Sequence, residues 1–327
     1  MADAGTPDVA GWLARRSYRA EDFPLERLLA DKRATVSVVL PARECAETIG
    51  PILERLLPLR EAGAIDELLV IDAASRDGTA RRAEELGADV VQEGEVLPGH
   101  GPVRGKGDAM WRALAATRGE VVAFLDADTS DFDARFALGL LGPLLADDSL
   151  LLVKGAYRRP LRIGGETVAD GGGRVTELVA RPLLNLHVPA LAGFVQPLAG
   201  EVAARRSLLE AIPFPVGYGV EIAMLIDALG AGGLDALAQV DLGTRLNRHQ
   251  PLRALGAMAY AVMVAAERRT HGLPGGSPGS LALPHDGALA HVEVAVEERP
   301  PLASLHDGVR GSWSARERSI VSARERP

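Results

Sequence analysis

The sequence has a single cysteine, no apolar run long enough to cross a bilayer and no recognisable secretory signal. Cys45 cannot form a disulfide within the chain, so we expect folding without disulfides in a reducing compartment, the cytoplasm. The longest helix-like apolar stretch, residues 255–266, falls short of the roughly 20 residues that a transmembrane helix needs. The start MADAGTPDVAGWLARR lacks a charged segment followed by an apolar core. We therefore expect no membrane association.

An excess of basic residues is also lacking. The 327 residues include 36 Lys plus Arg against 44 Asp plus Glu, which gives a net charge of −8. This balance excludes a general nucleic-acid binder, since such proteins carry a basic surface, but it leaves room for a local basic site for phosphate. With 47% apolar and 24% charged residues the composition is that of a globular protein, with one large domain or two modest ones.

Strands and helices alternate over the first half. Continuous apolar runs rich in branched residues predict buried strands at 35–40, 67–71, 89–91 and 120–125. Helical spacing follows them at 46–59, up to Gly87, and at 107–117. This alternation predicts an α/β fold with a mostly parallel sheet that helices cover on both faces.

The remaining segments are less regular. We expect strands at 150–153 and 236–242 and helices at 174–186, 219–230 and 252–268. Residues 1–33 are expected to form a polar lead-in anchored by Trp12, Tyr18 and Phe23. The divisions that follow are a nucleotide-binding half at 34–130, a second half at 131–271 and a Pro- and Gly-rich mobile tail at 272–327.

The tripeptide Asp126-Ala127-Asp128 follows a predicted buried strand. Parallel sheets bind ligands at the carboxyl ends of their strands, and two carboxylates there can hold a divalent cation against a diphosphate. A solvated turn is the alternative, because short acidic patterns occur by chance. The position after a buried strand favours metal or nucleotide binding.

Two glycine-containing segments precede predicted helices. Gly105-Lys106-Gly107 suits a phosphate, because it joins a close backbone approach to free N–H groups and a positive charge. A flexible turn with an exposed lysine is the alternative. The segment Gly171–Thr176 has the same physical features for a second anion. The residues 101–107 miss the P-loop pattern, because Gly101 and Gly105 are one residue too close and Gly107 replaces the Ser/Thr. No dinucleotide-binding glycine pattern follows the first strand, which argues against a dehydrogenase.

Tyr218 and Glu221 open another predicted helix, and Glu221 is open to two interpretations. Its carboxylate could complement the helix dipole, or it could bind a sugar.

Together these segments resemble the glucosyl-3-phosphoglycerate synthases, retaining glycosyltransferases of the GT-A fold. The resemblance runs from about Trp12 to Glu267 and does not include the tail. It rests on VSVVLPAR, ELLVIDAASRDGT, RGKGDAMWRALAATRGEVVAFLDAD, LLVKGAYRRPL, GGGRVTELVARPLL, FVQPLAGE, PFPVGYGVEI and GLDALAQVDLGTR. It implies transfer of glucose from UDP-glucose to the 2-hydroxyl of 3-phosphoglycerate with Mg²⁺ (Mn²⁺ as the alternative), a second half that binds the acceptor, and a homodimer.

The resemblance also implies roles for individual residues. Catalysis would fall to Asp128, Lys106 and Glu221, with Asp128 on the metal and Lys106 on the diphosphate. The nucleotide sugar would contact Pro41, Ala42, Arg43, Asp72, Ala73, Lys106, Asp126 and Ala127, where Ala73 stands in place of a family serine. The acceptor would contact Gly173, Arg174, Val175, Thr176, Tyr218 and His249.

The chain departs from the family pattern at two places. Glu44 and Cys45 replace the family's Asn and Glu, so one nucleotide contact is lost or moves to Glu44 or Glu47. Asn247-Arg248-His249 replaces HRN, so the second metal ligand would be Asn247 or His249, and Gln250 replaces an acceptor-side arginine.

Four alternatives follow for the function. The same fold could use GDP-mannose, or another small anionic hydroxy acid as acceptor. A nucleotidyltransferase would need a Gly- and Arg-rich loop after the first strand, where this chain has PARECAE. A nucleotide-sugar-binding protein with impaired catalysis is the fourth.

Overall fold

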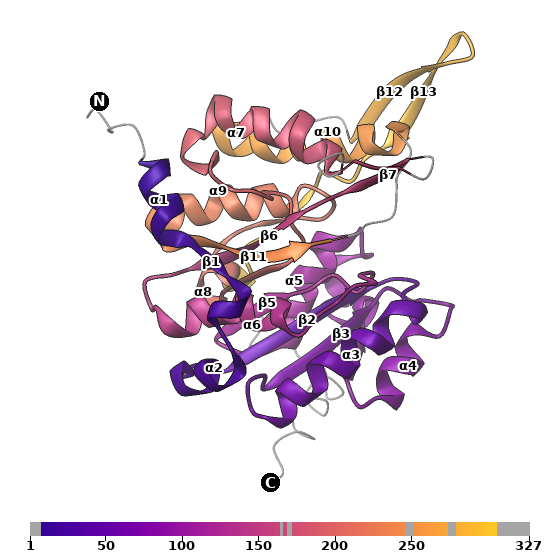
Figure 1. The fold of residues 1–327 in the computed structure, drawn as a ribbon. Helices are drawn as coiled ribbons and strands as arrows, with labels where there is room; N and C mark the ends of the chain where they lie inside the picture. Colours follow the sequence, from indigo (N-terminus) through magenta and orange to yellow (C-terminus); the bar gives the residue numbers. More distant parts are fainter. Residues whose placement is uncertain (1–7, 164–165, 169–171, 246–251, 274–278, 306–327) are drawn as a thin grey trace.

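The computed structural model describes residues 8–163, 166–168, 172–245, 252–273 and 279–305. An eight-stranded sheet runs through the molecule, and helices lie on both sides of it (Figure 1). The strand order is β1-β11-β6-β9-β5-β2-β3-β4, and only β9 runs antiparallel to its neighbours. The predicted α/β fold with a mostly parallel sheet is confirmed. The strands are β1 (Ser17–Arg19), β2 (Val36–Ala42), β3 (Glu67–Asp72), β4 (Asp89–Gln92), β5 (Val121–Phe124), β6 (Leu152–Arg158), β9 (Val202–Arg205) and β11 (Leu237–Thr244).

Alternate residues of the central strands enter two different cores. In β5, Val121 and Ala123 face one core, and Val122 and Phe124 face the other. Because both faces are covered, the strands are apolar throughout, which explains why continuous apolar runs predicted them.

The helices are α1 (Val9–Arg16), α2 (Leu25–Asp31), α3 (Ala46–Glu61), α4 (Thr79–Glu85), α5 (Lys106–Ala116), α6 (Arg135–Ala146), α7 (Arg181–His187), α8 (Arg206–Ala211), α9 (Val220–Gly232) and α10 (Leu252–Thr270). Among the described residues, none of these helices is both long and apolar enough to span a bilayer.

The N-terminal segment belongs to the sheet. Trp12 and Phe23 are buried, as expected, and the Trp12 indole N–H donates to the Leu237 carbonyl at 2.8 Å. Residues 17–19 form β1, which pairs in parallel with β11 at the sheet edge. Three residues are too few for a periodic pattern, so the sequence shows the anchors but not the strand.

The expected mobile tail is wrong for residues 279–305. They form a hairpin of β12 (Ser280–His285) and β13 (Ala288–Glu293), then β14 (Glu298–Arg299) and a short 3₁₀ helix at Leu302–Leu305. Strand β14 pairs with β10 (Phe214–Pro215). The sequence analysis expected a mobile tail because the segment lacks apolar periodicity. Backbone pairing and buried ion pairs hold the segment in place without it. Residues 306–327 lie outside the described part of the chain.

Helix 174–186 is also more complex than predicted. A π-helical turn at Thr176–Ala180 precedes α7, and the whole stretch lies beside α10 (Figure 1). The sequence analysis did not identify α6, α8 or β9.

Candidate functional site

Strands β2 and β3 end side by side. Ala42 pairs with Asp72 in the register, and the Ala73 N–H donates to the Ala42 carbonyl at 2.9 Å. Asp72 is buried; its Oδ2 accepts from the Ser75 N–H at 3.0 Å, and its Oδ1 has no hydrogen-bond partner among the described residues. A buried oxygen without a partner costs free energy unless a ligand supplies a donor. The structure thus brings Pro41 and Ala42 at the end of β2 next to Asp72 and Ala73, with Arg43 exposed beyond them.

The two loops that follow these strands are hydrogen-bonded to each other. The Glu44 N–H donates to Ser75 Oγ at 2.9 Å, and the Arg76 N–H donates to Glu44 Oε1 at 2.9 Å. Glu44 and Ala74 both have φ of 53°, the left-handed region that non-glycine residues rarely adopt. The Glu44 carboxylate is therefore already engaged in holding the loops together.

A cluster of charges lies beside these strand ends, half-buried at Lys106 and Asp126 and buried at its other members. Lys106 Nζ at the start of α5 is 2.6 Å from Asp126 Oδ1 and 3.1 Å from Glu221 Oε1 in the first turn of α9. Arg245 Nη1 is 3.6 Å from Asp126 Oδ2 and also pairs with the buried Glu201. We call Lys106, Asp126, Glu221, Arg245 and Glu201 the buried ion cluster. It joins three of the predicted site residues.

Electrostatics fixes the charges of the two central groups. Burial favours the neutral form of Lys106, but Asp126 and Glu221 outweigh it and raise the pKa of the ammonium. Burial likewise favours the neutral form of Asp126, but Lys106 and Arg245 outweigh it and lower the pKa of the carboxyl. Both groups are charged at neutral pH. The two readings of Glu221 converge here, because its carboxylate opens α9 and also pairs with Lys106.

Gly200 provides the room for the central pair. A Cβ on this glycine would lie 2.3 Å from Asp126 Oδ1 and 2.4 Å from Lys106 Nζ. Gly107 likewise has no room for a side chain, since an added Cβ would lie 1.9 Å from the Pro215 carbonyl oxygen. The glycine before the predicted phosphate site, Gly105, has φ of 135°. The segment Gly105-Lys106-Gly107 is thus a closely packed helix start, and not a flexible turn.

Lys154 on β6 is the most unusual charged residue near the cluster. Its side chain is 1% exposed and its Nζ has no hydrogen-bond partner among the described residues. Burial, together with the nearby charge of Lys106, outweighs the opposing effect of Glu221 and Asp126 and lowers the pKa of this ammonium to about 8. Three donors without acceptors indicate a site that a ligand would complete.

Asp128 differs from every member of the cluster. It is exposed, and its carboxylate makes no hydrogen bond or ion pair with the described residues. Its negative charge adds to burial in raising the pKa of the Cys45 thiol, so it faces the loop after β2. Thr48 Oγ1 donates to the Ala127 carbonyl at 2.6 Å and ties this turn to α3. A free carboxylate oxygen suits a hard divalent cation, so Asp128 fits the predicted metal-ligand role.

The predicted second metal ligands cannot be placed. Asn247, His249 and the acceptor-side Gln250 lie outside the described residues, as does Gly171. Arg245, the last described residue before them, is bound within the cluster.

The second glycine segment lies close to the cluster. The Gly172 N–H donates to the Arg159 carbonyl at 2.9 Å, and Gly173 has φ of 68°. Arg159 Nη2 donates to the Tyr157 hydroxyl at 2.9 Å, and its charge contributes to lowering the pKa of Asp126. The guanidinium carbon of Arg245 lies 5.5 Å from the centre of the Tyr157 ring. The ends of β5, β6 and β11 and the start of the π-helical turn therefore meet at one place.

The predicted acceptor residues differ in exposure. Thr176 is buried, Gly173, Arg174 and Val175 are half-buried, and Tyr218 is 53% exposed beside the start of α9.

Sequence analysis missed Lys154, Glu201, Gly200 and Arg245 as site residues. All four lie within motifs that carried the resemblance, LLVKGAYRRPL, FVQPLAGE and the GTR at the end of β11. For Lys154, a charged residue within the apolar strand β6 was the available signal, because burying an unpaired charge is costly.

Comparisons with known proteins give concordant results. A model of the glycosyl transferase family 2 matches residues 37–154. The glucosyl-3-phosphoglycerate synthase of Mycolicibacterium paratuberculosis is 45% identical over 305 residues, covering 90% of this chain and 92% of the relative. The crystal structure of mannosyl-3-phosphoglycerate synthase from Rubrobacter xylanophilus has a TM-score of 0.82 and 47% identity, covering 92% of this chain and 99% of that one. The glucosyl-3-phosphoglycerate synthase of Mycobacterium tuberculosis, in complex with Mn²⁺, UDP-glucose and phosphoglyceric acid, has a TM-score of 0.77 and 44% identity, covering 86% and 95%.

Proposed function

Because this chain belongs to the glucosyl-3-phosphoglycerate synthase family of glycosyltransferases, we propose that it transfers glucose from UDP-glucose to the 2-hydroxyl of 3-phosphoglycerate. The observation that carries the proposal is the buried ion cluster with Asp128 beside it, a carboxylate without a partner in the described part of the chain, at the carboxyl ends of β2, β3 and β5. The solved relative with Mn²⁺, UDP-glucose and phosphoglyceric acid supports it at 44% identity.

The nucleotide would lie along the ends of β2 and β3. Asp72 Oδ1 is an acceptor in need of a donor, and a uracil N–H or a ribose hydroxyl supplies one. Pro41, Ala42 and the backbone at Ala73 form the adjoining surface.

Lys106 would stabilise charge on the leaving diphosphate. Asp126 and Glu221 hold its ammonium in place and keep it protonated. Preorganised positive charge where negative charge develops is usually the largest catalytic contribution. Asp128, with Asn247 or His249, would hold a divalent cation, Mg²⁺ or Mn²⁺, which supplies further charge neutralisation at the diphosphate.

Retention would proceed without a carboxylate nucleophile. Glu221 is the carboxylate of the cluster suited to the sugar side, but its Oε1 is 3.1 Å from Lys106 Nζ, and a carboxylate held in an ion pair is a weak nucleophile. Attack by the acceptor hydroxyl on the face from which the diphosphate departs, with the leaving phosphate accepting the proton, places no such demand on Glu221.

The acceptor would bind at the start of the π-helical turn. Gly172 and Gly173 allow close backbone approach, and Arg159 and Arg174 supply positive charge for a phosphate and a carboxylate. This assigns residues 34–130 to the nucleotide and 131–271 to the acceptor.

Product analysis tests this function. UDP release and glucosyl-3-phosphoglycerate formation are measured with Mg²⁺, with Mn²⁺ and with EDTA, for the parent and for Asp128→Ala. The control is Asp148→Ala, a fully exposed carboxylate near the opposite edge of the sheet that pairs with Arg205. Transfer that requires the cation, persists in Asp148→Ala and is lost in Asp128→Ala supports the proposal. Near-normal transfer by Asp128→Ala refutes the metal assignment.

A mannosyl donor is the second candidate. The solved mannosyl-3-phosphoglycerate synthase is 47% identical to this chain, and Ala73 stands where a family serine touches the nucleotide. Competition between UDP-glucose and GDP-mannose at equal concentration, read out as UDP against GDP, decides between the donors. Predominant GDP release would replace glucose by mannose in the proposal.

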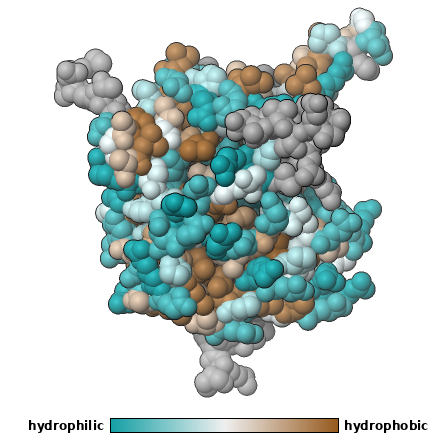
Figure 2. Space-filling view, in the orientation of Figure 1, coloured by the Kyte–Doolittle hydropathy of each residue, from teal (hydrophilic) through white to brown (hydrophobic). Residues whose placement is uncertain are grey.

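We also propose a homodimer. Leu178 and Leu186, 72% and 74% exposed, are large apolar residues of a kind that an interface covers. Figure 2 shows apolar patches among polar ones along the upper edge of this face, where α7 and α10 lie. Light scattering after gel filtration gives the assembly mass, and a monomer mass at micromolar concentration would contradict the dimer.

A further inference from the structure

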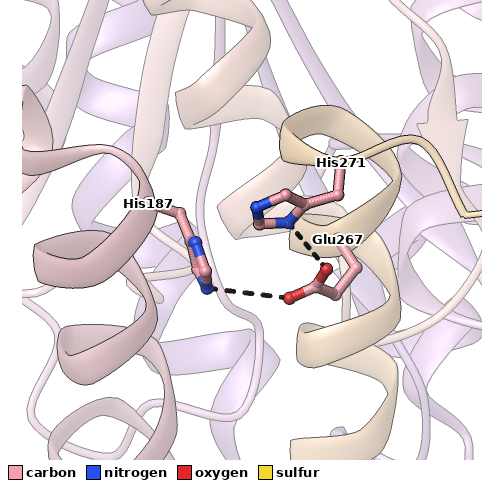
Figure 3. Close-up of side chains that lie close together, drawn as sticks. All are labelled: His187, Glu267 and His271. Atoms are coloured by element: carbon pink, nitrogen blue, oxygen red, sulfur yellow. Dashed lines mark hydrogen bonds and ion pairs between the residues drawn. The ribbon is translucent and has the colours of Figure 1, made fainter.

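Three side chains that could ligate a metal meet between α7 and α10, away from the buried ion cluster (Figure 3). They are His187, Glu267 and His271. His187 Nε2 is 3.8 Å from Glu267 Oε1, and His271 Nδ1 is 2.9 Å from Glu267 Oε2. One potential ligand atom from each residue lies within 4.8 Å of the other two.

Local structure fixes this arrangement from both sides. Glu267 and His271 are four residues apart at the end of α10, so they lie on one face of the helix. The His271 and Gly272 N–H groups both donate to the Glu267 carbonyl, at 2.9 and 3.1 Å, and Gly272 ends the helix with φ of 68°. His187 is the last residue of α7, and its ring packs edge-on against that of His271 with centroids 4.5 Å apart.

The electrostatics of this place favours a cation. The C-terminal ends of α7 and α10 both lie at the cluster, and the C-terminal end of a helix carries partial negative charge. The two arginines next to Glu267 in sequence are directed to other carboxylates. Arg268 pairs with Glu298 at 3.9 Å, and Arg269 pairs with Asp227 and Glu298 at 2.8 Å each. Neither arginine neutralises Glu267.

We propose that His187, Glu267 and His271 bind a divalent transition-metal ion of the Zn²⁺ type. Two imidazoles and one carboxylate with an open fourth position for water form a common zinc ligand set. Zinc bonds of about 2.0–2.1 Å in a tetrahedron place neighbouring ligand atoms about 3.3 Å apart. Here the three ligand atoms, one from each residue, lie within 4.8 Å of one another, so the side chains would draw together around the ion. Small side-chain rotations suffice, since all three residues are partly exposed at 20–54%.

The chemistry of this site differs from that of Asp128. Imidazole nitrogen favours zinc, nickel and copper, whereas Mg²⁺ prefers oxygen ligands. The ion would link the end of α7 to the end of α10. The helical stretch that ends in α7 begins at the predicted acceptor segment, so the ion would fix that helix from its far end. The proposal does not depend on which sugar or acceptor the enzyme uses.

The test is calorimetric titration of metal-free full-length protein with Zn²⁺. The parent for this experiment is Asp128→Ala, with Mg²⁺ in excess, so that the oxygen-ligand site does not contribute. In this background we compare His187→Ala, His271→Ala and Glu267→Gln. The control is His291→Ala, an exposed histidine on β13 that bonds Ser280.

The parent and His291→Ala should each bind one Zn²⁺, and their Tm should rise on zinc addition. His187→Ala, His271→Ala and Glu267→Gln should each bind zinc at least about tenfold more weakly. Even changes outside the ligand shell of a metal lower its affinity by about 10–100-fold. Melting curves in EDTA show whether the variants fold; Glu267→Gln changes no side-chain size and serves if an alanine variant fails. Absence of zinc binding by the parent, or zinc binding by the three histidine and glutamate variants that equals that of the parent, overturns the proposal.

Discussion

The buried ion cluster and the exposed turn that follows it are built on opposite principles, although Asp126 and Asp128 are only two residues apart. Both Asp126 oxygens face cations, at 2.6 and 3.6 Å, whereas the Asp128 carboxylate has no partner among the described residues. A carboxylate that is already paired helps position other groups. A carboxylate that is free can bind an ion that arrives with the substrate. From this difference we propose that Asp126 serves structure and electrostatics, and that Asp128 would hold the metal.

Amide substitution at each aspartate should separate these roles. Asp128→Asn should lower turnover by about 10³-fold or more, because the cation that neutralises the diphosphate loses its ligand, while the melting temperature stays close to that of the parent. Asp126→Asn should lower both, because Lys106 and Arg245 lose their shared counter-charge within the protein. Steady-state kinetics and thermal melts are the measurements. Equal melting temperatures for the two variants would contradict the structural role that we give to Asp126 and not to Asp128.

Part of this contrast was predictable from sequence. The βα alternation of residues 35–125 gave the strands and helices within a few residues, because each buried strand is a continuous apolar run. The same alternation placed Lys106 and Asp126 at one edge of the sheet. Glu201 immediately precedes β9 and Arg245 immediately follows β11. Arg245 pairs with both Asp126 and Glu201 through contacts across the fold that no local pattern records.

The position of β9 in the sheet could not be predicted from the order of elements along the chain. This strand inserts antiparallel between β5 and β6, which are distant in sequence from it. Gly200 precedes it, and a single glycine carries no signal of what a side chain there would meet. Sequence therefore gives which residue types are present near a strand end, and the long-range contacts decide which of them are paired.

A methyl group at Gly200 should break the cluster from within. The added carbon of Gly200→Ala would lie 2.3 Å from Asp126 Oδ1 and 2.4 Å from Lys106 Nζ, so the pair must separate. We expect about a 10²-fold loss of turnover, the effect of displacing one preorganised charge. Gly230→Ala is the control, since its Cβ would meet nothing within 4 Å in helix α9, and it should stabilise the protein by about 0.5–1 kcal/mol. Full activity of Gly200→Ala would show that the pair is dispensable.

Lys154 tests the electrostatic environment of the cluster through pH. Its folded-state pKa of about 8 lies below the ordinary 10.5, so between these values the unfolded chain binds more protons and stability rises with pH. Lys154→Met removes the buried ammonium, so it should be more stable than the parent below pH 8, by at most about 3 kcal/mol. The difference should shrink as pH rises from 8 towards 10.5. Urea melts at pH 7, 8.5 and 10 measure it, and a constant difference would contradict the lowered pKa.

The tail provides the smallest and most distant test of the comparison. Arg299 on β14 donates to both oxygens of the buried Asp108, at 2.9 and 2.5 Å, and Asp108 also pairs with Arg112 at 3.0 Å. Asp108 lies in the first turn of α5, two residues after Lys106, so the tail helps to hold the helix start that carries the cluster's lysine.

Arg299→Ala should therefore reach the buried ion cluster but not the Asp128 turn. We expect a loss of about 2 kcal/mol in stability, less than the 3–5 kcal/mol of a fully broken buried pair because Arg112 remains. Arg33→Ala is the control, since Arg33 only donates to nearby exposed carbonyls. Turnover should fall modestly while the cation concentration that gives half-maximal activity stays unchanged, because Asp128 is untouched. A shift in that concentration would mean that the two carboxylates, despite their different surroundings, respond to the tail as one unit.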